Sequence, residues 1–145
     1  MSFLSGEYNH QLDAKNRIRI PARLKKELGD EYCFAKGDHN CVYIYSQKEM
    51  EAKIELAKQT KISDIEKQKS LRAFMRTIVP AAEDTQGRVV LTPELREHLL
   101  FEDNERDIVV IGVATRAEIW SKSNYDKYFG GIKNDYDSAI ANLDF

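Results

Sequence analysis

The sequence has little of what marks several common protein classes: its 145 residues include only 2 cysteines, 3 prolines and 7 glycines. Two cysteines are too few for a disulfide framework, which agrees with a reducing cytosol. No apolar run approaches the roughly 18 residues that a membrane span requires. Residues 1–6 lack both the basic start and the apolar core of a signal peptide. We therefore expect a cytoplasmic protein without a membrane partner.

Apolar and charged residues are present in ordinary proportions, 42% and 32%. This apolar content is enough for a packed core, which excludes disordered and low-complexity classes. The length favours one compact domain, or two very small ones, because domains typically run about 100–200 residues.

Charge is distributed unevenly, although the net charge is only −2. Residues 13–28 contain six basic and two acidic side chains, whereas residues 83–107 contain three basic and eight acidic ones. The total argues against a simple polycation that coats nucleic acid. It hides, however, a basic segment and an acidic one.

One pattern occurs twice in the chain. Residues 13–20 (DAKNRIRI) match residues 84–91 (DTQGRVVL) at an offset of 71. Farther on, glycine, isoleucine, aromatic and serine residues within 37–46 match residues within 112–121 at an offset of 75, so the second copy carries four extra residues near 101–105. The acidic, polar character of this insert predicts an exposed loop. The chain therefore contains two copies of a unit of about 45 residues, joined by a different kind of segment.

Each copy is predicted to contain a strand, a tight turn, a second strand, a short helix, two more strands and a helix. Tyr8, His10 and Leu12 alternate with polar residues, which is the period of a half-buried strand. The turns at 13–16 and 84–87 are predicted to close β-hairpins, because Asp favours the first position and Asn or Gly accepts a positive φ at the last. The later strands are expected at residues 32–35, 42–45, 108–111 and 117–120.

Capping residues predict where the helices begin and end. Thr92, followed by a proline, predicts the start of the second copy's short helix, in which Leu95 and Leu99 share one face. The first copy has Pro21 at the position of Thr92, so its cap must be built differently. Gly29 is predicted to end that first helix.

The segment between the copies is predicted to be helical. Ser46-x-x-Glu49 and Ser63-x-x-Glu66 are capping boxes. An apolar stripe with helical spacing precedes Pro80, which ends the pattern; its members are Leu71, Phe74, Met75 and Ile78. The C-terminal stretch is expected to form a weakly ordered helix or tail. The expected organisation is a first repeat at residues 3–54, a helical connector at 55–80, a second repeat at 81–129 and the C-terminal segment at 130–145.

Metal binding and catalysis find little support in the sequence. Cys33, His39 and Cys41 match no common zinc spacing, and a fourth ligand would have to come from a distant residue such as His10. We interpret the two cysteines as buried, and we interpret His98 as a solvated or C-terminal helix residue. The serines show no nucleophile elbow, and no phosphate-binding glycine loop is present. We therefore expect no enzymatic activity and no cofactor.

Two Asp-x-x-x-Arg motifs carry the functional hypothesis, and we call residues 13–17 tip 1 and residues 84–88 tip 2. A purely structural interpretation is that Asp13 caps its own turn and pairs with Arg17. Basic residues at or just after tip 1 favour DNA binding instead, because Lys and Arg neutralise phosphates and Arg can donate two hydrogen bonds to guanine; they are Lys15, Arg17, Arg19 and Arg23. Repetition favours binding, since two similar tips, multiplied by oligomerisation, add avidity.

The residues around both motifs closely resemble the MraZ family. The resemblance rests on the pattern G-E-Y-x-H-x-L-D-A-K-x-R-x-x-I-P at residues 6–21, on tip 2 and on residues 111–121, and it covers about residues 3–129. It implies an α+β, mainly β fold: a tandem swapped-hairpin β-barrel of the AbrB/MazE type, whose two copies interlock, with short outer helices. It also implies a closed, ring-like homo-oligomer that binds double-stranded DNA at repeated promoter boxes and regulates the bacterial division and cell-wall gene cluster, and hence association with the nucleoid.

The resemblance assigns DNA contacts to individual residues: Lys15, Asn16 and Arg17, and Gln86, Gly87 and Arg88. Arg19 is expected to contact DNA because it is a basic residue just after tip 1, and Asp13 and Asp84 are expected to organise the turns. Asn16 replaces the family's usual glycine, but Asn tolerates a positive φ, so the turn should survive. Gln86 stands where a basic residue would bind DNA more strongly. We therefore expect tip 2 to contribute less affinity than tip 1.

Two alternative functions stay open on the sequence. The chain could be a ring-forming scaffold whose basic tips bind an acidic protein surface. It could also be an antitoxin-like repressor of the same fold whose tail binds a toxin, although the short, partly apolar C-terminus argues against this.

Overall fold

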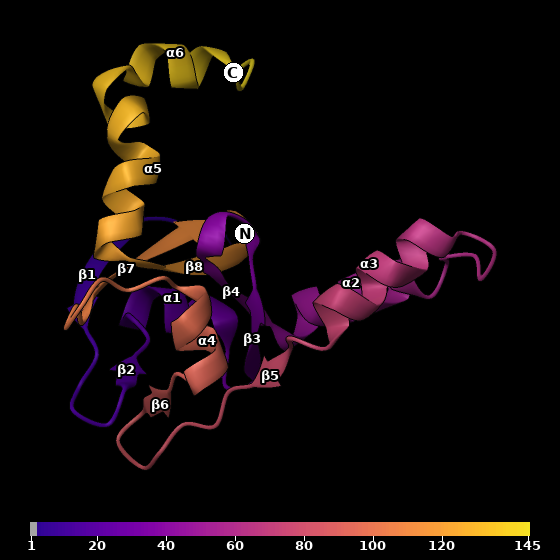
Figure 1. Cartoon of the computed structure of the whole chain (residues 1–145), viewed down its shortest axis with the longest axis horizontal. Coiled ribbons are helices and arrows are strands. Elements are labelled where there is room, and N and C mark those ends of the chain that lie inside the picture. The colour runs from indigo at the N-terminus through magenta and orange to yellow at the C-terminus, as the bar shows by residue number, and fades with distance from the viewer. Residues whose placement is uncertain (1–2) are drawn as a thin grey trace.

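Strands and helices follow one another in the same order in both copies (Figure 1). The structure, a computed structural model, describes residues 3–145. The first copy contains β1 (Glu7–Gln11), β2 (Arg17–Arg19), α1 (Ala22–Leu28), β3 (Tyr32–Lys36), the 3-10 turn η1 (Asp38–Asn40), β4 (Val42–Ser46) and α2 (Gln47–Ala57). The second contains β5 (Val79–Pro80), β6 (Arg88–Val90), α4 (Pro93–His98), β7 (Asp107–Val113), β8 (Arg116–Ser121) and α5 (Lys122–Asn134). Helix α3 (Ile65–Met75) lies between the copies, and α6 (Tyr136–Ala141) follows the second, so the predicted order is confirmed.

Several strand pairs join one copy to the other. Within residues 3–145, a six-stranded antiparallel sheet has the order β1-β7-β8-β4-β3-β5, and β2 and β6 form a separate two-stranded ribbon. The pairs β1–β7, β4–β8, β3–β5 and β2–β6 each link the first copy to the second. At the centre of the ribbon, Ile18 lies opposite Val89. The fold is therefore mixed α+β with a mainly antiparallel sheet, and each copy completes the other.

The tips do not join two paired strands into a β-hairpin, contrary to the prediction from sequence, although a single antiparallel bridge between Glu83 and Val89 flanks tip 2. In the described part of the chain, β1 pairs with β7 and β2 pairs with β6, so the strands on either side of tip 1 belong to different sheets. The turn itself is closed by a backbone hydrogen bond from Asp13 N to Arg17 O at 3.0 Å. A period of two predicts which side chains are buried, but it does not identify the partner strand.

Among the described residues, the six-stranded sheet does not close into a barrel through backbone hydrogen bonds. Across residues 3–145, β1 and β5 form its two edges, so the closed barrel that the resemblance implied is not formed. The ribbon instead completes the core through its side chains, because Ile18 and Val89 are both buried in the same cluster as the sheet residues. Packing across the two sheets takes the place of a continuous hydrogen-bond ladder.

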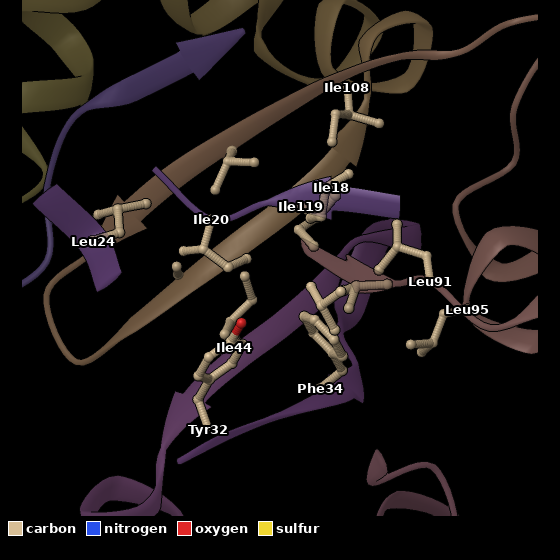
Figure 2. Close-up of a cluster of buried hydrophobic side chains, with 14 of the residues drawn as sticks. Ile18, Ile20, Leu24, Tyr32, Phe34, Ile44, Leu91, Leu95, Ile108 and Ile119 are labelled. Atoms are coloured by element: carbon tan, nitrogen blue, oxygen red, sulfur yellow. The ribbon is translucent and has the colours of Figure 1, made fainter. Parts of the chain in front are cut away.

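One core cluster joins the sheet, the ribbon and the two short helices (Figure 2). Leu24 of α1 and Leu95 of α4 occupy matching positions in the two copies, and each is 1% exposed. Burying one such side chain contributes about 1.5–3 kcal/mol. Sheet residues of the same cluster include Phe34, Ile44, Ile108 and Ile119. Both tips therefore extend from a base that the two copies build together.

Helix caps largely follow the prediction. The hydroxyls of Ser46, Thr92 and Ser121 each accept a hydrogen bond from the backbone N–H three residues later. Pro21 offers no side-chain cap, and its carbonyl accepts the first helical N–H at 2.9 Å instead. Gly29 ends α1 with a φ of 81°.

Some helix limits differ from the sequence prediction. The N-cap of α3 is Asp64 rather than Ser63, because the Asp64 carboxylate accepts from Lys67 N at 3.0 Å and aspartate caps a helix as well as serine does. Helix α2 runs through the expected boundary between residues 54 and 55, and α5 runs through the one between 129 and 130. The C-terminal segment contains the end of α5 and all of α6. Residues 101–106 carry no helix or strand, as predicted for the insert.

Helix α3 ends before the apolar stripe does. The Thr77 hydroxyl donates to Phe74 O at 2.8 Å and accepts from Lys36 N at 3.1 Å, which ends the helix and connects it to β3. Phe74 and Ile78 pack against buried residues of β3 and β4, whereas Met75 is 39% exposed. The pair α2–α3 extends away from the sheet (Figure 1). None of the helices within residues 3–145 is long and apolar enough to cross a membrane.

Candidate nucleic-acid interface

Tip 1 is organised by the carboxylate of Asp13. Its Oδ1 accepts hydrogen bonds from the backbone N–H groups of Lys15 and Arg17, both at 2.9 Å, and its Oδ2 accepts from Arg17 Nε at 2.8 Å. Asn16 completes the turn with a φ of 61°. One side chain therefore fixes both the backbone of the turn and the guanidinium that follows it.

Tip 2 repeats this geometry atom for atom. Asp84 Oδ1 accepts from the backbone N–H groups of Gln86 and Arg88 at 2.8 and 2.9 Å, and Oδ2 accepts from Arg88 Nε at 3.0 Å. Gly87 takes the positive φ, 76°, that Asn16 takes in tip 1. The Asp-x-x-x-Arg spacing thus produces the same turn twice.

Hydrogen bonds keep both turn carboxylates ionised. The backbone N–H of Arg17, as the largest cause, lowers the pKa of Asp13 below its ordinary value of 3.8. The backbone N–H of Arg88 does the same for the pKa of Asp84. Because the folded-state pKa is depressed, each carboxylate stabilises its turn above pH 3.8, and that contribution is lost as the pH falls through the lowered value.

The two tips lie next to each other. Arg17 Nη1 is 3.5 Å from Asp84 Oδ2, and Arg19 Nη2 donates to Gln86 O at 2.7 Å. Figure 1 shows both turns at one end of the molecule, on the side away from α5 and α6. The structure therefore brings the two tips and Arg19 together, whereas Arg23 lies on α1, beside Phe3 and Ser5.

The tips differ in their available charge. Lys15 is exposed and forms no ion pair with any residue in the described part of the chain. The side chains of Arg17 and Arg88 are only 20% and 30% exposed, and each is paired with a carboxylate. Gln86, which stands in tip 2 where Lys15 stands in tip 1, carries no charge. The unpaired cation of the two tips therefore lies on tip 1.

Sequence reasoning missed Arg106, which lies in the loop before β7. Its Nε donates to Leu12 O at 3.3 Å, and its Nη2 donates to Asp13 O and, at 2.9 Å, to Asn16 Oδ1. No local signal marks Arg106, because it is a lone basic residue in an acidic stretch. Its role depends on contacts with residues 90 to 94 positions away.

Sequence reasoning also missed Glu83, which directly precedes tip 2. Its carboxylate accepts from the Tyr32 hydroxyl at 2.6 Å and lies 3.2 Å from Lys25 Nζ. Burial, together with the Glu83 carboxylate, raises the pKa of the Tyr32 hydroxyl, so this group stays a donor. The entry to tip 2 is thereby tied to α1 and β3 of the first copy.

The cysteines and histidines give no metal site within residues 3–145. Cys33 and Cys41 are buried, and burial raises the pKa of both thiols. His39 lies in the exposed turn η1. His98 is the last residue of α4, but it is not fully solvated, since its Nε2 lies 2.9 Å from Gly37 O.

Comparison with known proteins agrees with this geometry. A family model described as "MraZ protein, putative antitoxin-like" matches residues 3–73 and 80–142. A "Transcriptional regulator MraZ" of Thermoanaerobacter sp. (strain X514) is 37% identical over 148 residues, covering 97% of this chain and 96% of the relative. Another, of Alkaliphilus oremlandii (strain OhILAs), is 40% identical over 141 residues, covering 94% of this chain and 93% of the relative. The chain therefore belongs to the MraZ family.

Proposed function

We propose that this chain is a sequence-specific DNA-binding transcriptional regulator without catalytic activity. The relatives that match nearly its whole length are named transcriptional regulators. Its DNA would be repeated promoter boxes upstream of the bacterial division and cell-wall gene cluster, which implies association with the nucleoid. The observation that carries the proposal is the pair of adjacent Asp-x-x-x-Arg tips at one end of the molecule.

The tips have the chemistry that a DNA groove requires. Lys15 offers an unpaired ammonium for a phosphate. Arg17 uses Nε and Nη1 on the two turn carboxylates. Its Nη2 has no hydrogen-bond partner among residues 3–145, so it is available to a phosphate or a base edge. Gln86 and Arg88 would make the matching contacts of tip 2, and Asn16 and Gly87 would allow the close approach of the backbone.

Tip 1 supplies most of the affinity in this proposal. Its ammonium is free, whereas tip 2 has an amide at Gln86 and follows the acidic Glu83. A single chain presents few unpaired cations here, so several chains are needed to reach the contact number of a specific complex.

Exposed apolar side chains support a closed homo-oligomer. Leu56, Ile62 and Ile65 are exposed on the α2–α3 arm, and Tyr136 and other apolar residues are exposed at the C-terminus. Residues 56–72 contain five basic and two acidic side chains, whereas residues 126–145 contain two basic and four acidic ones. Figure 1 shows these two parts projecting from the sheet in different directions. Their opposite charges suit a head-to-tail contact between copies, which closes into a ring.

A gel-shift assay tests the proposed function. The chain is titrated onto DNA from upstream of its own gene and onto shuffled DNA of the same composition. We expect retention of the first at lower protein concentration. The variant Lys15→Ala should weaken this retention, whereas Lys48→Ala, at the exposed start of α2 and outside residues 56–72, is a matched control that removes the same charge. Equal retention of both DNAs, or none, would favour the scaffold function.

Light scattering tests the oligomer separately. We expect a mass of several chains at micromolar concentration. A monomer at that concentration would remove the oligomeric part of the proposal and leave the DNA-binding tips to be judged by the gel shift.

A further inference from the structure

Tip 1 is held by a side chain of the second copy. The Arg106 guanidinium donates to the carbonyls of Leu12 and Asp13 and to Asn16 Oδ1. These three acceptors lie at the entry of the turn and at its positive-φ residue. A single planar guanidinium therefore fixes both ends of the loop that presents Lys15.

Tip 2 is held by a side chain of the first copy. Arg19 Nη2 donates to Gln86 O at 2.7 Å. The Arg19 side chain also passes over the next residue, since a Cβ placed on Gly87 would lie 4.0 Å from Arg19 Nε. This guanidinium covers the middle of tip 2, as Arg106 covers the edge of tip 1.

We call the contacts of Arg106 with tip 1 and of Arg19 with tip 2 braces. The two braces do not come from matching positions of the repeated sequence. At the offset of 71, the counterpart of Arg19 is Val90, which has no donor to offer tip 1. At the offset of 75, the counterpart of Arg106 is Glu31, which carries the opposite charge. Each copy thus lacks the brace that the other copy provides, and together with the Arg17–Asp84 contact at 3.5 Å the braces join the tips into one unit.

We propose that Arg106 and Arg19 are positioning residues, each holding the tip of the opposite copy in the geometry that binds DNA. The inference rests on the proposed function for its DNA part. A brace that orders a loop before binding improves affinity by lowering the ordering cost. Arg19, expected from its position just after tip 1 to contact DNA, acts in this proposal through tip 2.

Hydrogen exchange of the full-length protein without DNA tests the braces. The variant Arg106→Ala should raise the exchange rate of peptides covering tip 1 roughly tenfold, the effect of losing a charge-assisted hydrogen bond, and leave tip 2 unchanged. Arg19→Ala should show the reverse. Equal changes in both tips, or no change in either, would overturn the proposal.

DNA affinity of paired variants separates positioning from direct contact. Arg106→Ala should weaken binding in the parent and in an Arg88→Ala background, but add little once Lys15→Ala has removed the ammonium of tip 1. Its salt dependence should stay that of the parent. Full additivity with Lys15→Ala, together with a salt slope shallower by about 0.9, would make Arg106 a phosphate contact and overturn the proposal.

The conservative variant gives a further distinction. Arg106→Lys keeps the charge but replaces the planar guanidinium, which donates from both Nε and Nη2, by a single ammonium nitrogen, so it should not restore the slow exchange of tip 1. Full restoration would show that charge alone matters and would contradict the brace. If the parent fails to bind DNA at all, the proposed function fails, while the exchange experiment still decides whether the braces exist.

Discussion

Tips 1 and 2 have the same internal geometry but different surroundings. In both, an aspartate accepts two backbone N–H groups and one guanidinium N–H, with distances from 2.8 to 3.0 Å. Tip 1 carries a free ammonium and is braced by Arg106, whereas tip 2 carries an amide and is covered by Arg19. The comparison shows that the motif determines the turn, while the opposite copy determines what the turn presents.

The entries to the tips also differ. Leu12 precedes tip 1 and is buried in the core, with 5% of its surface exposed. At the matching position, Glu83 precedes tip 2 and is held by Tyr32 and Lys25. One copy anchors its tip by apolar burial and the other by a polar network. We expect the first anchor to be insensitive to salt and pH, and the second to respond to both.

The largest effects should come from the core, where the copies are equivalent. Leu24→Ala and Leu95→Ala each remove a side chain that is 1% exposed, so each should cost about 2–5 kcal/mol of unfolding free energy. Urea denaturation at fixed protein concentration measures this. If one variant were nearly as stable as the parent while the other unfolded, the two copies would not share one core.

The next largest effect should be a loss of DNA affinity, and this loss should be greater for Arg17→Ala than for Arg88→Ala. Arg17→Ala should weaken DNA binding by about 1.5–3 kcal/mol, the range for one charge-assisted hydrogen bond, since it removes the free Nη2 donor of the stronger tip. Arg88→Ala should weaken binding less, because tip 2 has fewer free cations. Arg17→Ala removes contacts with Asp13 and Asp84, whereas Arg88→Ala removes one with Asp84. The melting temperature of each variant is therefore measured beside its DNA affinity, so that lost stability is told apart from lost binding. Parent-like DNA binding by Arg17→Ala, with lost stability, would make the turn a structural device only.

A variant that adds a positive charge to tip 2 should reduce the difference in DNA affinity between the tips. Gln86→Lys gives tip 2 the cation that Lys15 gives tip 1, and one new phosphate contact should steepen the slope of log K against log salt by about 0.9. Gel shifts at several salt concentrations measure the slope. Gln47→Lys, at the exposed start of α2, is the matched control, and an equal gain there would mean a general charge effect.

The smallest effect should appear at acidic pH. Asp13→Asn and Asp84→Asn should each lower the melting temperature near neutral pH, because the amide cannot replace the ionised acceptor. Since the pKa of each carboxylate is lowered below 3.8, the difference between parent and variant should shrink as the pH falls below that value. A constant difference from pH 7 to pH 3 would contradict the role of these carboxylates.

Local features of the fold could be predicted from the sequence, but the pairing of strands that lie far apart in the chain could not. The turns, the caps at Ser46 and Thr92, and the buried faces of Leu24 and Leu95 depend on residues close together in the chain. The ribbon between β2 and β6 depends on which strand meets which, and a period of two contains no such information. For this reason the sequence did not reveal that β1 pairs with β7 and β2 with β6 rather than with each other.

The candidate site shows the same division. Asp13 and Asp84 could be found because their partners are two and four residues away. Arg106 could not, because an arginine's long side chain reaches acceptors that only the folded chain brings near. The sequence suggested the Asp13–Arg17 pair as a structural interpretation, and the structure shows this pair and its counterpart between Asp84 and Arg88. It leaves the ammonium of Lys15 without an ion pair among the described residues.

The salt dependence of DNA binding tests the central claim most directly. The affinity of the parent protein for DNA from upstream of its own gene is measured over a range of salt concentrations, beside the variant Lys15→Ala. If several chains place their tips on phosphates, the slope of log K against log salt should be steeper than about −3 and should become shallower in the variant. A flat response, or a slope that Lys15→Ala leaves unchanged, would contradict binding of DNA through the tips.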